Sequence, residues 1–382
     1  MKQRLALLGS TGSIGEQTLD IVRDFPQWYE VTTLTSNTRW ERLAQQAREF
    51  SPDSVVIADK RFYLPLKEAL SDTDVKVYAG SEAIGQVVRG EAVDVVVNAL
   101  VGYAGLAPTV SAIEAGKKLA LANKESLVVA GAAVMRMAAE RKVPVVPIDS
   151  EHSAILQCLV GESSPVRKLI ITASGGSFRD TPAEQLGTAT VEQALHHPNW
   201  NMGAKITIDS STLVNKGFEV IEARWLFGVE PEKIEVVIHP QSIVHSMVEF
   251  EDGAIKAQLG TPDMHLPIHY ALTFPRRAPS RRDRFSFLEH PELNFLPVDR
   301  VKYPAVDIAF DCLRRGGTAC CVMNGANEVA VAAFLKGRIG YLDIVKTISR
   351  TLERASFVAE PSLADYESSN AEAREIASSL IG

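Results

Sequence analysis

Two carboxylates stand two residues apart at the end of an apolar run, the segment VPVVPIDSEH of residues 143–152. If Asp149 and Glu151 continue an extended strand, both side chains lie on one side of the backbone. Ligand sites in parallel sheets lie at the carboxyl ends of strands, where two acids repel each other unless a cation or a shared proton intervenes. With no cysteine or suitably spaced histidine nearby, the pair favours Mg²⁺ or Mn²⁺. A solvated acidic pair on the surface is the alternative.

A third carboxylate would favour the metal site, and the segment NKGFEVIEARWLF, residues 215–227, offers two. Glu219 and Glu222 are expected at the start of a helix, where a spacing of three residues lets them share a face. A cation bound by Asp149, Glu151 and one of these acids keeps coordination positions open for substrate oxygens. The spacing does not choose between Glu219 and Glu222.

Clusters of small polar residues with glycine, typical of anion sites, occur in the middle of the chain. They are Ser174-Gly175-Gly176-Ser177, Asp209-Ser210-Ser211-Thr212 and Asn215-Lys216-Gly217. Backbone and hydroxyl donors together with one lysine suit a phosphate dianion. Turn formation explains the SGGS sequence equally well, because glycine and serine dominate turns.

The histidines fall in segments of different character. Residues 196–203, HHPNWNMG, lack periodicity and are expected to form a mobile lid over a site. The adjacent histidines of this segment do not match the spacing of zinc ligands. His265 and His269 are four residues apart, but Pro267 is expected to interrupt a helix there, so hydrogen-bonded or core roles are favoured. His290 lies in a predicted linker.

Glycines at positions 9, 12 and 15 form the sequence GSTGSIG between a first apolar strand and a predicted helix over residues 16–25. Such a turn needs glycine where the chain turns tightly, where the backbone approaches a pyrophosphate and where helix meets strand. The N–H groups at the helix start then bind phosphate. Its place at the first strand-to-helix junction of an alternating segment favours dinucleotide binding over a merely structural turn.

The end of the second predicted strand indicates which dinucleotide is bound. A protein that binds NAD carries Asp or Glu there, about 20 residues after the glycine turn, to hold the ribose hydroxyls. Here the chain reads TSNTR over residues 35–39, without a carboxylate. Ser36, Asn37 and Arg39 can donate to a 2′-phosphate instead, so NADPH is predicted over NADH.

The elements that must position these residues divide the chain into four parts. In residues 1–149 six apolar runs alternate with helical patterns, which predicts an α/β fold with a Rossmann-like, doubly wound parallel sheet that binds NADPH. Residues 150–273 predict an α+β catalytic domain that carries the metal site, the substrate site and the lid. Its expected strands are VRKLIITAS, AKITIDSS, KIEVVIHP, HSMVEF and AIKAQLG. Residues 274–299 predict a linker and residues 300–382 a C-terminal helical bundle.

Composition limits the partners and the compartment. A net charge of −7 argues against general nucleic-acid binding, and the apolar runs fall well short of the ~20 residues that a membrane helix needs. One stretch, FPRRAPSRRDR at residues 274–284, is basic and is interpreted as a solvated connection rather than an anion site. Four cysteines without a C-x-x-C pair favour buried thiols and a location in the reduced cytoplasm.

Several longer motifs occur together in one order: GSTGSIG, LANKES, PIDSEH, ASGGSFR, HHPNWNMG, IDSSTLVNKGFEVIEARWLF, HPQSIVHSM and QLGTPDM. In these motifs, which span the predicted domains, the chain closely resembles the 1-deoxy-D-xylulose 5-phosphate reductoisomerase family. The resemblance implies that a phosphorylated ketose, 1-deoxy-D-xylulose 5-phosphate, is isomerised and reduced with NADPH to 2-C-methyl-D-erythritol 4-phosphate in the non-mevalonate isoprenoid pathway. It also implies a homodimer.

Carried onto matching positions, the resemblance implies roles for single residues. Asp149, Glu151 and Glu219 would bind Mg²⁺ or Mn²⁺, with Co²⁺ a further option, so that Glu219 is selected over Glu222. These three acids and Lys124 are the implied catalytic residues. NADPH would contact Thr11, Gly12, Ser13, Ile14, Ser36, Asn37, Asn123, Glu125 and Gly203. The implied substrate contacts are Ser174, Ser210, Asn215 and Lys216 at the phosphate, His197 and Trp200 on the lid, Lys124 and Ser150 at the hydroxyls and carbonyl, and the acids Glu151 and Glu219.

The chemistry implied by the resemblance is a retro-aldol cleavage and re-aldol closure that yield an aldehyde, followed by hydride transfer from NADPH. A metal that chelates two substrate oxygens would polarise the ketone. Lys124 either assists proton movement or only orients the hydroxyls. Two other functions stay open: a reductase on the same scaffold that acts on another sugar phosphate, and a non-catalytic protein that senses NADPH. A substrate panel tests the first, and a metal titration without substrate-dependent binding would support the second.

Overall fold

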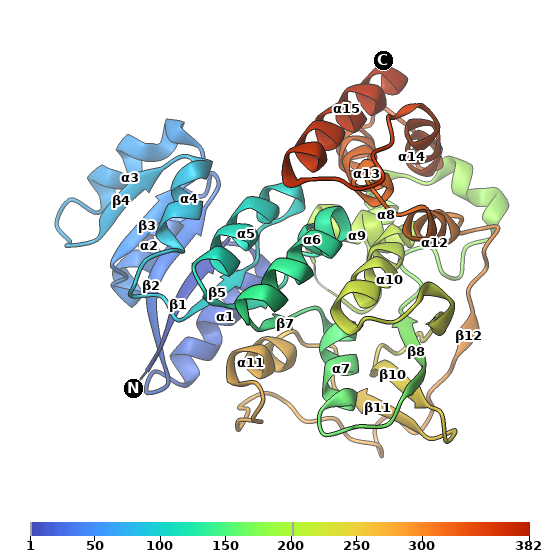
Figure 1. The fold of residues 1–382 in the computed structure, drawn as a ribbon, viewed down its shortest axis with the longest axis horizontal. Coiled ribbons are helices and arrows are strands. Elements are labelled where there is room, and N and C mark those ends of the chain that lie inside the picture. The colour runs from blue at the N-terminus through green and yellow to red at the C-terminus, as the bar shows by residue number, and fades with distance from the viewer. Residues whose placement is uncertain (1, 201) are drawn as a thin grey trace. The chain divides into compact units, whose positions relative to one another are not determined.

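The computed structural model describes residues 2–200 and 202–382, so Met1 and Asn201, the latter in the predicted lid, lie outside the description. The chain forms two compact units (Figure 1). It passes from one to the other within two helices, α6 (Glu125–Arg141) and α7 (Ser150–Leu159), and again after Pro262 and after Arg282. Unit 1 comprises Met1–Ser126, Val134–Ser153 and Asp263–Arg282, and unit 2 comprises Leu127–Ala133, Ala154–Pro262 and Asp283–Gly382.

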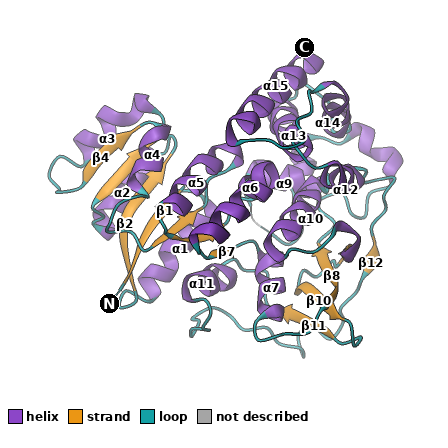
Figure 2. Ribbon diagram, in the orientation of Figure 1, coloured by secondary structure: helices purple, strands orange, loops and turns teal. Residues whose placement is uncertain are grey.

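Unit 1 is built on a parallel sheet of seven strands in the order β4-β3-β2-β1-β5-β6-β7 (Figure 2). The strand order reverses between β1 and β5, and helices connect the strands, which confirms the predicted Rossmann-like, doubly wound fold. The strands are β1 (Gln3–Leu8), β2 (Tyr29–Ser36), β3 (Ser54–Ile57), β4 (Lys76–Ala79), β5 (Val95–Asn98), β6 (Lys118–Leu121) and β7 (Val145–Pro147).

The sequence predicts six strands in this part of the chain and does not predict β4. Its residues KVYA alternate between exposed and half-buried at the edge of the sheet, so they form no apolar run. The helices of unit 1 include those that connect its strands. They are α1 (Ser13–Asp24), η1 (Lys60–Phe62), α2 (Trp40–Phe50), α3 (Tyr63–Ala69), α4 (Ser81–Val87), η2 (Gly102–Gly105), α5 (Leu106–Glu114) and α11 (His265–Thr273), besides the parts of α6 and α7 that belong to the unit.

Helix α11 belongs to unit 1 although residues 150–273 read as one domain in the sequence. It buries Ile268 and Leu272 and packs against α1, β6 and β7. The basic connection that follows is attached to the same unit, because Arg282 Nη2 lies 3.1 Å from Asp24 Oδ2 at the end of α1. The compact units and the four parts read from the sequence therefore differ at this segment.

Unit 2 contains a mixed sheet of five strands in the order β11-β10-β8-β9-β12. β8 pairs with β9 in parallel, and the other neighbouring strands are antiparallel. Four of these strands lie where the sequence predicts them, and β12 lies within the predicted linker. The strands are β8 (Val166–Ala173), β9 (Ile234–Ile238), β10 (Val244–Phe250), β11 (Ile255–Leu259) and β12 (Leu296–Pro297).

The segment AKITIDSS is a helix, α9 (Ala204–Ser211), so the prediction of a strand there is wrong. Its alternation of isoleucine with polar residues resembles a half-buried strand, but the second half of the segment is buried throughout. Local contacts support the helix: Lys205 Nζ lies 2.9 Å from Asp209 Oδ2, and Thr207 Oγ1 donates to the carbonyl of Gly203 at 2.9 Å. A short pattern cannot separate the two periods when a segment is buried on all sides.

The predicted helical bundle is present beyond residue 300, and its core is continuous with that of the mixed sheet. Val306 and Met323 from its helices belong to the same buried cluster as Ile171 and Val236 from the strands. Among the described residues, every helix is too short or too polar to cross a membrane. The further helices of unit 2 are η3 (Ala183–Thr188), α8 (Val191–Leu195), α10 (Val214–Phe227), η4 (Pro231–Lys233), α12 (Ala305–Arg315), α13 (Ala319–Leu335), α14 (Asp343–Arg354) and α15 (Leu363–Ile381).

Candidate cofactor and substrate sites

The glycine turn joins β1 to α1 at the carboxyl edge of the parallel sheet. Gly9 has a φ of +80°, and a Cβ there would lie 2.7 Å from the carbonyl oxygen of Ala99. A Cβ at Gly15 would lie 2.3 Å from the carbonyl oxygen of Gly9. At Gly12 the nearest atom would be 3.4 Å away, which is ordinary contact. The fold itself therefore requires glycine at 9 and 15, whereas Gly12 leaves a bare backbone that a ligand can approach.

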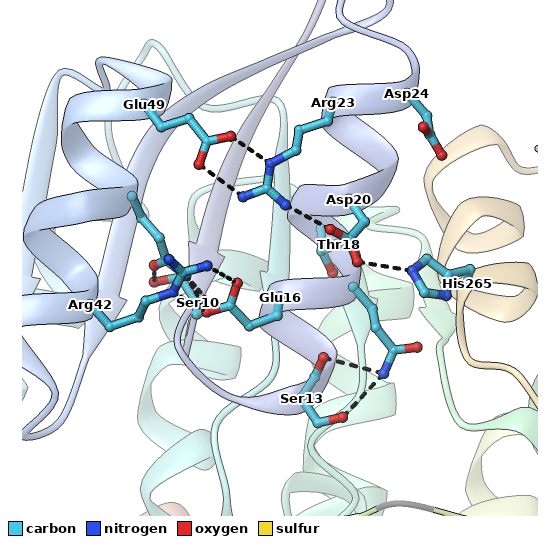
Figure 3. A network of polar contacts seen from close by, with 12 residues as sticks. Ser10, Ser13, Glu16, Thr18, Asp20, Arg23, Asp24, Arg42, Glu49 and His265 are labelled. Atoms are coloured by element: carbon cyan, nitrogen blue, oxygen red, sulfur yellow. Dashed lines mark hydrogen bonds and ion pairs between the residues drawn. The ribbon is translucent and has the colours of Figure 1, made fainter.

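A network of polar contacts holds this turn against α2 (Figure 3). Glu16, in the first turn of α1, accepts from Arg42 Nε at 2.7 Å and from Gln46 Nε2 at 2.9 Å. Gln46 is fully buried and accepts from Ser10 Oγ at 2.7 Å. The N–H of Ser10 donates to the carbonyl of Thr35 in β2 at 2.9 Å. The turn is therefore fixed from two sides before any ligand contacts it.

The residues predicted to select NADPH surround the end of β2. Thr11 Oγ1 and Ser36 Oγ are 2.9 Å apart, and Arg39 Nη1 donates to the carbonyl of Thr11 at 3.0 Å. Asn37 and Arg39 are exposed. A guanidinium thus lies beside the glycine turn at the strand end, where it can attract a 2′-phosphate.

Asn123 follows β6 and is 1% exposed. Its Nδ2 donates to the carbonyls of Leu100 and Gly102 and to Glu125 Oε2, each at 3.0 Å. Its Oδ1 accepts from the N–H of Ser126 at 3.0 Å. The side chain therefore ties the loop after β5 to the start of α6. A contact of Asn123 with NADPH, as the family resemblance implies, would use its backbone.

Asp149 and Glu151 do not continue a strand, because β7 ends at Pro147 and α7 begins at Ser150. The expected extended pair is therefore wrong in its backbone. Asp149 Oδ1 accepts from the N–H of Glu151 at 3.1 Å, as an N-cap residue does. Aspartate is a favourable N-cap, which explains why the chain turns into a helix directly after the strand.

Lys124 lies beside this cap. Its Nζ contacts Asp149 Oδ2, and His152 Nδ1 lies 3.3 Å from Asp149 Oδ1. Burial alone would raise the pKa of Asp149, but the charges of Lys124 and His152 outweigh burial and hold the pKa well below its usual range. Ser150 Oγ donates to Oε2 of the following residue, Glu151. Unit 1 thus presents two carboxylates, a hydroxyl and an ammonium group at the carboxyl ends of two neighbouring strands, β6 and β7.

In unit 2, Glu219 and Glu222 lie inside α10 rather than at its start. The helix begins at Val214 and includes Gly217. Position 217 requires glycine because α12 packs closely there: a Cβ on Gly217 would lie 2.7 Å from Ala309 Cβ. The prediction that the helix starts near Glu219 is therefore wrong by more than a turn. A glycine required by close packing resembles a turn glycine in the sequence.

Glu219 is buried beside two donors of the same helix. It is 1% exposed, Asn215 Nδ2 donates to its Oε1 at 2.6 Å, and Lys216 Nζ contacts its Oε2. Glu222 is 3% exposed. A buried carboxylate needs a positive partner, which is Lys216 here, and a hard metal ion can take that place.

His197 orients the hydroxyl of Ser174. Its Nδ1 accepts from the backbone N–H groups of Asn199 at 3.2 Å and Trp200 at 3.0 Å, so the neutral ring carries its proton on Nε2. Nε2 donates to Ser174 Oγ at 3.0 Å, and the N–H of Gly176 donates to the same oxygen at 3.2 Å. Because Ser174 Oγ accepts two hydrogen bonds, its own proton is available for an anion.

Arg179 adds positive charge to this cluster, although the sequence analysis gives it no role. Its Nη1 donates to the carbonyl of Ser174 at 3.2 Å, and its side chain lies along Gly175. Burial, and then the charge of Arg179, lower the pKa of His197 to about 4, so the imidazole is neutral at physiological pH. The signal that could have found Arg179 is a cation directly after an SGGS cluster, in ASGGSFR.

Ser210 lies in the last turn of α9 and is 8% exposed. Gly176 has a φ of +68°, and a Cβ there would lie 2.5 Å from the carbonyl oxygen of Ser210. The SGGS loop therefore abuts the end of α9. Asn215 and Lys216 follow in the first turn of α10, which begins three residues after α9 ends. The structure thus gathers the four residues predicted to bind phosphate on adjoining segments.

Besides the bond of His197 to Ser174, the predicted lid is attached through Asn199. Asn199 Nδ2 donates to the carbonyl of Pro240 at 2.6 Å and to Ser242 Oγ at 2.8 Å. The ring of Trp200 lies 6.2 Å from that of His245. Gly203 is exposed and forms the N-cap of α9. Movement of this segment stays a prediction.

The remaining histidines have structural roles. Pro267 lies in the first turn of α11, where its missing N–H is tolerated, so the expected interruption of the helix is wrong. His265 Nε2 lies 3.2 Å from Asp20 Oδ2 (Figure 3), and its Nδ1 lies 2.5 Å from Asp263 Oδ1. His269 is buried among aromatic rings. The hydrogen-bonded and core roles predicted for the pair are confirmed.

All four cysteines are free and buried, as predicted. Burial and, to a lesser degree, neighbouring carboxylates raise the pKa of Cys312 and of Cys321 to about 12. Thiols with such pKa values are poor nucleophiles and poor metal ligands at physiological pH.

Family models cover most of the chain. Those described as 1-deoxy-D-xylulose 5-phosphate reductoisomerase, its C-terminal domain and DXP reductoisomerase C-terminal domain match residues 5–131, 145–227 and 259–376. A protein from Bacteroides thetaiotaomicron, named 1-deoxy-D-xylulose 5-phosphate reductoisomerase, is 54% identical over 381 residues, which are 100% of this chain and 98% of that protein.

Solved structures agree with this likeness. The reductoisomerase from Zymomonas mobilis in complex with NADPH is 42% identical with a TM-score of 0.92, over 100% of this chain and 99% of that chain. A DOX-P reductoisomerase in complex with NADPH, fosmidomycin and magnesium is 40% identical with a TM-score of 0.93, over 99% of this chain and 98% of that chain.

Proposed function

This chain belongs to the 1-deoxy-D-xylulose 5-phosphate reductoisomerase family, and from that premise we propose that it converts 1-deoxy-D-xylulose 5-phosphate and NADPH into 2-C-methyl-D-erythritol 4-phosphate. This reaction would place it in the non-mevalonate isoprenoid pathway. The observation that carries the proposal is the pairing, at the carboxyl edge of one parallel sheet, of a glycine turn open to a dinucleotide with the acid–lysine group of Asp149 and Lys124.

NADPH fits the chain at the carboxyl edge of this sheet. The backbone at Gly12 is open, the start of α1 offers N–H groups, and Arg39 lies beside the turn. When bound, NADPH supplies the hydride for the reduction. The proposed contacts are Thr11, Gly12, Ser13, Ile14, Ser36, Asn37, Asn123, Glu125 and Gly203.

A divalent cation, Mg²⁺ or Mn²⁺ with Co²⁺ as a further option, fits the chemistry of three carboxylates. We assign Asp149, Glu151 and Glu219 as its ligands. In each unit one of these acids faces a lysine ammonium, Lys124 or Lys216, which shows that its environment accommodates positive charge. When bound, the cation supplies electrophilic polarisation of the substrate carbonyl. The magnesium in the related DOX-P reductoisomerase structure supports this choice of metal.

The substrate phosphate is assigned to Ser174, Ser210, Asn215 and Lys216, with His197 and Trp200 on the lid. Ser174 donates its hydroxyl proton because His197 and Gly176 occupy its oxygen as donors. Binding of this unreactive group would provide energy to close the lid and exclude water. The fosmidomycin complex of a relative supports a substrate site of this kind.

Lys124 and Ser150 are assigned to the reacting end of the substrate. The ammonium of Lys124, held by ionised Asp149, can donate a proton to an oxygen that gains negative charge while a carbon–carbon bond shifts. Ser150 Oγ, next to Glu151, can orient a substrate hydroxyl. The rearrangement precedes reduction, because it yields the aldehyde that accepts hydride.

The assembly and the compartment extend the proposal. We assign a homodimer, supported by exposed apolar residues on the edge strands of the mixed sheet, Ile255 on β11 and Leu296 on β12. We place the enzyme in the cytoplasm, supported by four free cysteines. Light scattering on the purified protein checks the first point: a mass of one chain would contradict the dimer.

Product identification tests the function. The protein is incubated with 1-deoxy-D-xylulose 5-phosphate, NADPH and Mg²⁺ or Mn²⁺, and the product is examined by NMR. We expect 2-C-methyl-D-erythritol 4-phosphate with one NADPH consumed per molecule formed. A panel of other ketose phosphates in the same assay separates this function from that of a related reductase. NADPH binding without turnover of any substrate would overturn the assignment.

A further inference from the structure

Side chains from the part of unit 2 beyond residue 300 contact the two segments that carry the proposed phosphate ligands. Tyr303, Asn327 and Tyr341 each hydrogen-bond a residue next to Ser174 or Ser210. All three are buried in unit 2, and none of them is among the residues assigned to the substrate. Their contacts therefore connect the helical part of unit 2 to the phosphate site.

Tyr341 supports the end of α9. Its hydroxyl donates to the carbonyl of Ser211 at 2.6 Å. The last carbonyls of a helix have no donor within the helix, so this bond satisfies a group that the chain would otherwise leave unpaired. The ring of Tyr341 packs edge-on against Phe178, with centroids 4.8 Å apart, and against Phe334 at 5.9 Å. The hydroxyl is therefore held in place by a rigid ring.

Asn327 supports the same turn from α13. Its Nδ2 donates to Asp209 Oδ1 at 2.8 Å, and Asp209 Oδ2 pairs with Lys205. Asn327 is fully buried and Asp209 is 2% exposed. Ser210 thus stands between two residues, Asp209 and Ser211, that are both anchored to the helical part.

The SGGS loop is anchored in a similar way. The hydroxyl of Tyr303 donates to the carbonyl of Gly175 at 3.2 Å. Lys302 Nζ donates to the carbonyls of Phe178 at 2.6 Å and Thr181 at 2.6 Å, just after this loop. The same ammonium donates to the carbonyl of Arg179 at 2.9 Å, so three carbonyl oxygens converge on it and fix the path of the backbone.

We propose that Tyr341, assisted by Asn327 and Tyr303, is a positioning residue for substrate phosphate: it holds the end of α9 so that the Ser210 hydroxyl keeps the direction that the dianion needs. The inference rests on the proposed function, since it takes Ser210 as a phosphate ligand. Because one buried hydrogen bond is typically worth about a tenfold change in an equilibrium, its loss weakens phosphate binding by about that factor.

The test compares Tyr341→Phe with Tyr366→Phe in the full-length protein. Both remove the hydroxyl of a buried tyrosine beyond residue 300, but Tyr341 lies in the turn before α14, whereas Tyr366 lies on α15, which packs against α13 and α14. Steady-state kinetics give KM and kcat for 1-deoxy-D-xylulose 5-phosphate and KM for NADPH. Inorganic phosphate, used as a competitive inhibitor, gives a Ki for the anion alone.

For Tyr341→Phe we expect KM and the phosphate Ki to rise by about tenfold, with kcat and the NADPH KM within about twofold. Tyr366→Phe leaves all four unchanged. An unchanged phosphate Ki in Tyr341→Phe, or an equal rise in Tyr366→Phe, overturns the positioning role. If Tyr341→Phe does not fold, Tyr303→Phe is measured in its place with the same expected split.

Ser210→Ala separates this inference from the function on which it rests. We expect that variant to raise KM and the phosphate Ki. If Ser210→Ala has this effect and Tyr341→Phe does not, the positioning role fails while the phosphate assignment stands. If Ser210→Ala lowers kcat alone, the phosphate assignment itself is wrong, and with it the inference.

Discussion

At the scale of single residues, the two proposed parts of the metal site use the same pairing of a carboxylate with a lysine. Asp149 faces Lys124 in unit 1, and Glu219 faces Lys216 in unit 2. The two acids differ in their other contacts, because Asp149 also caps a helix whereas Glu219 accepts from the side chain of Asn215. Glu151 accepts a hydrogen bond from Ser150, its neighbour in the sequence.

Glu151→Gln tests the metal assignment. The amide keeps the size of the side chain but removes its charge, so we expect turnover to fall below detection while NADPH affinity stays within about twofold, because the proposed cofactor contacts are elsewhere. Initial rates and a fluorescence titration with NADPH measure the two effects. Glu162→Gln, which breaks an ion pair with Lys256 in unit 2, serves as the matched control and should leave both unchanged. Normal turnover by Glu151→Gln would remove Glu151 from the site.

His197 predicts a dependence of stability on pH. The folded protein binds a proton at His197 only near pH 4, whereas the unfolded chain binds it near pH 6.5. Between these values the unfolded state holds more protons, so the contribution to stability is lost as pH falls from about 6.5 to about 4. We expect His197→Gln to flatten the slope of the unfolding free energy in this window.

Urea unfolding of the wild type and the variant at pH 7, 6 and 5 measures that slope. His290→Gln, at an exposed position, is the matched control and should keep the slope of the wild type. His265, whose pKa is raised despite burial by bonds to Asp263 and Asp20, acts in the opposite direction but is present in all three proteins. Equal slopes for the wild type and His197→Gln would contradict the role of this residue.

At the scale of elements, the sequence predicts most strands of both sheets, because buried strands are continuous apolar runs between turns. It does not predict β4, whose residues at the sheet edge lack such a run, and it mistakes α9 for a strand because an all-round buried segment hides its period. The candidate site was predicted largely from motif resemblance. Elementary spacing gave Asp149 and Glu151 but misjudged their backbone, since an N-cap aspartate and the last residue of a strand look alike in sequence.

The glycine turn yields a matched pair of variants. A Cβ at Gly15 would meet the turn's own backbone at 2.3 Å, so Gly15→Ala should lower the melting temperature by several degrees or prevent folding. A Cβ at Gly12 has ordinary contacts, so Gly12→Ala should fold normally and weaken NADPH binding by about tenfold or more through obstruction of the pyrophosphate. Thermal melts and NADPH titrations distinguish them. Unchanged NADPH affinity in Gly12→Ala would place the cofactor elsewhere.

At the scale of the whole molecule, unit 2 joins a sheet and a helical bundle in one core, and this core also holds thiols. Cys158, Cys312 and Cys320 belong to the buried cluster, and Cys321 is fully buried beside it. Tyr303 and Tyr341 belong to the same buried cluster, and their hydroxyls donate to the carbonyls of Gly175 and Ser211. The helical bundle is therefore part of the catalytic fold rather than an appended module.

Thiol labelling can follow the opening of this core. We expect a thiol reagent at pH 8 to leave all four cysteines of the native protein unmodified over minutes, because all four are buried and burial raises the pKa of Cys312, Cys320 and Cys321. The same reagent should modify all four at once in denaturant. Mass spectrometry counts the modified thiols. Rapid labelling of any cysteine in the native protein would show that unit 2 opens locally.

Unit 1 is built from segments that lie far apart in the sequence, and this affects how it folds during synthesis on the ribosome. Helix α11 covers α1, yet it is made only after residues 154–262 have left the synthesis site. At about 5–20 residues per second, the partner of α1 arrives seconds after the rest of the parallel sheet is complete. During that interval the nascent chain exposes Phe25 and Tyr29, which His269 later contacts. The last stage of folding of unit 1 therefore waits for the synthesis of α11. Until then, the uncovered face of α1 is a surface that a chaperone could bind.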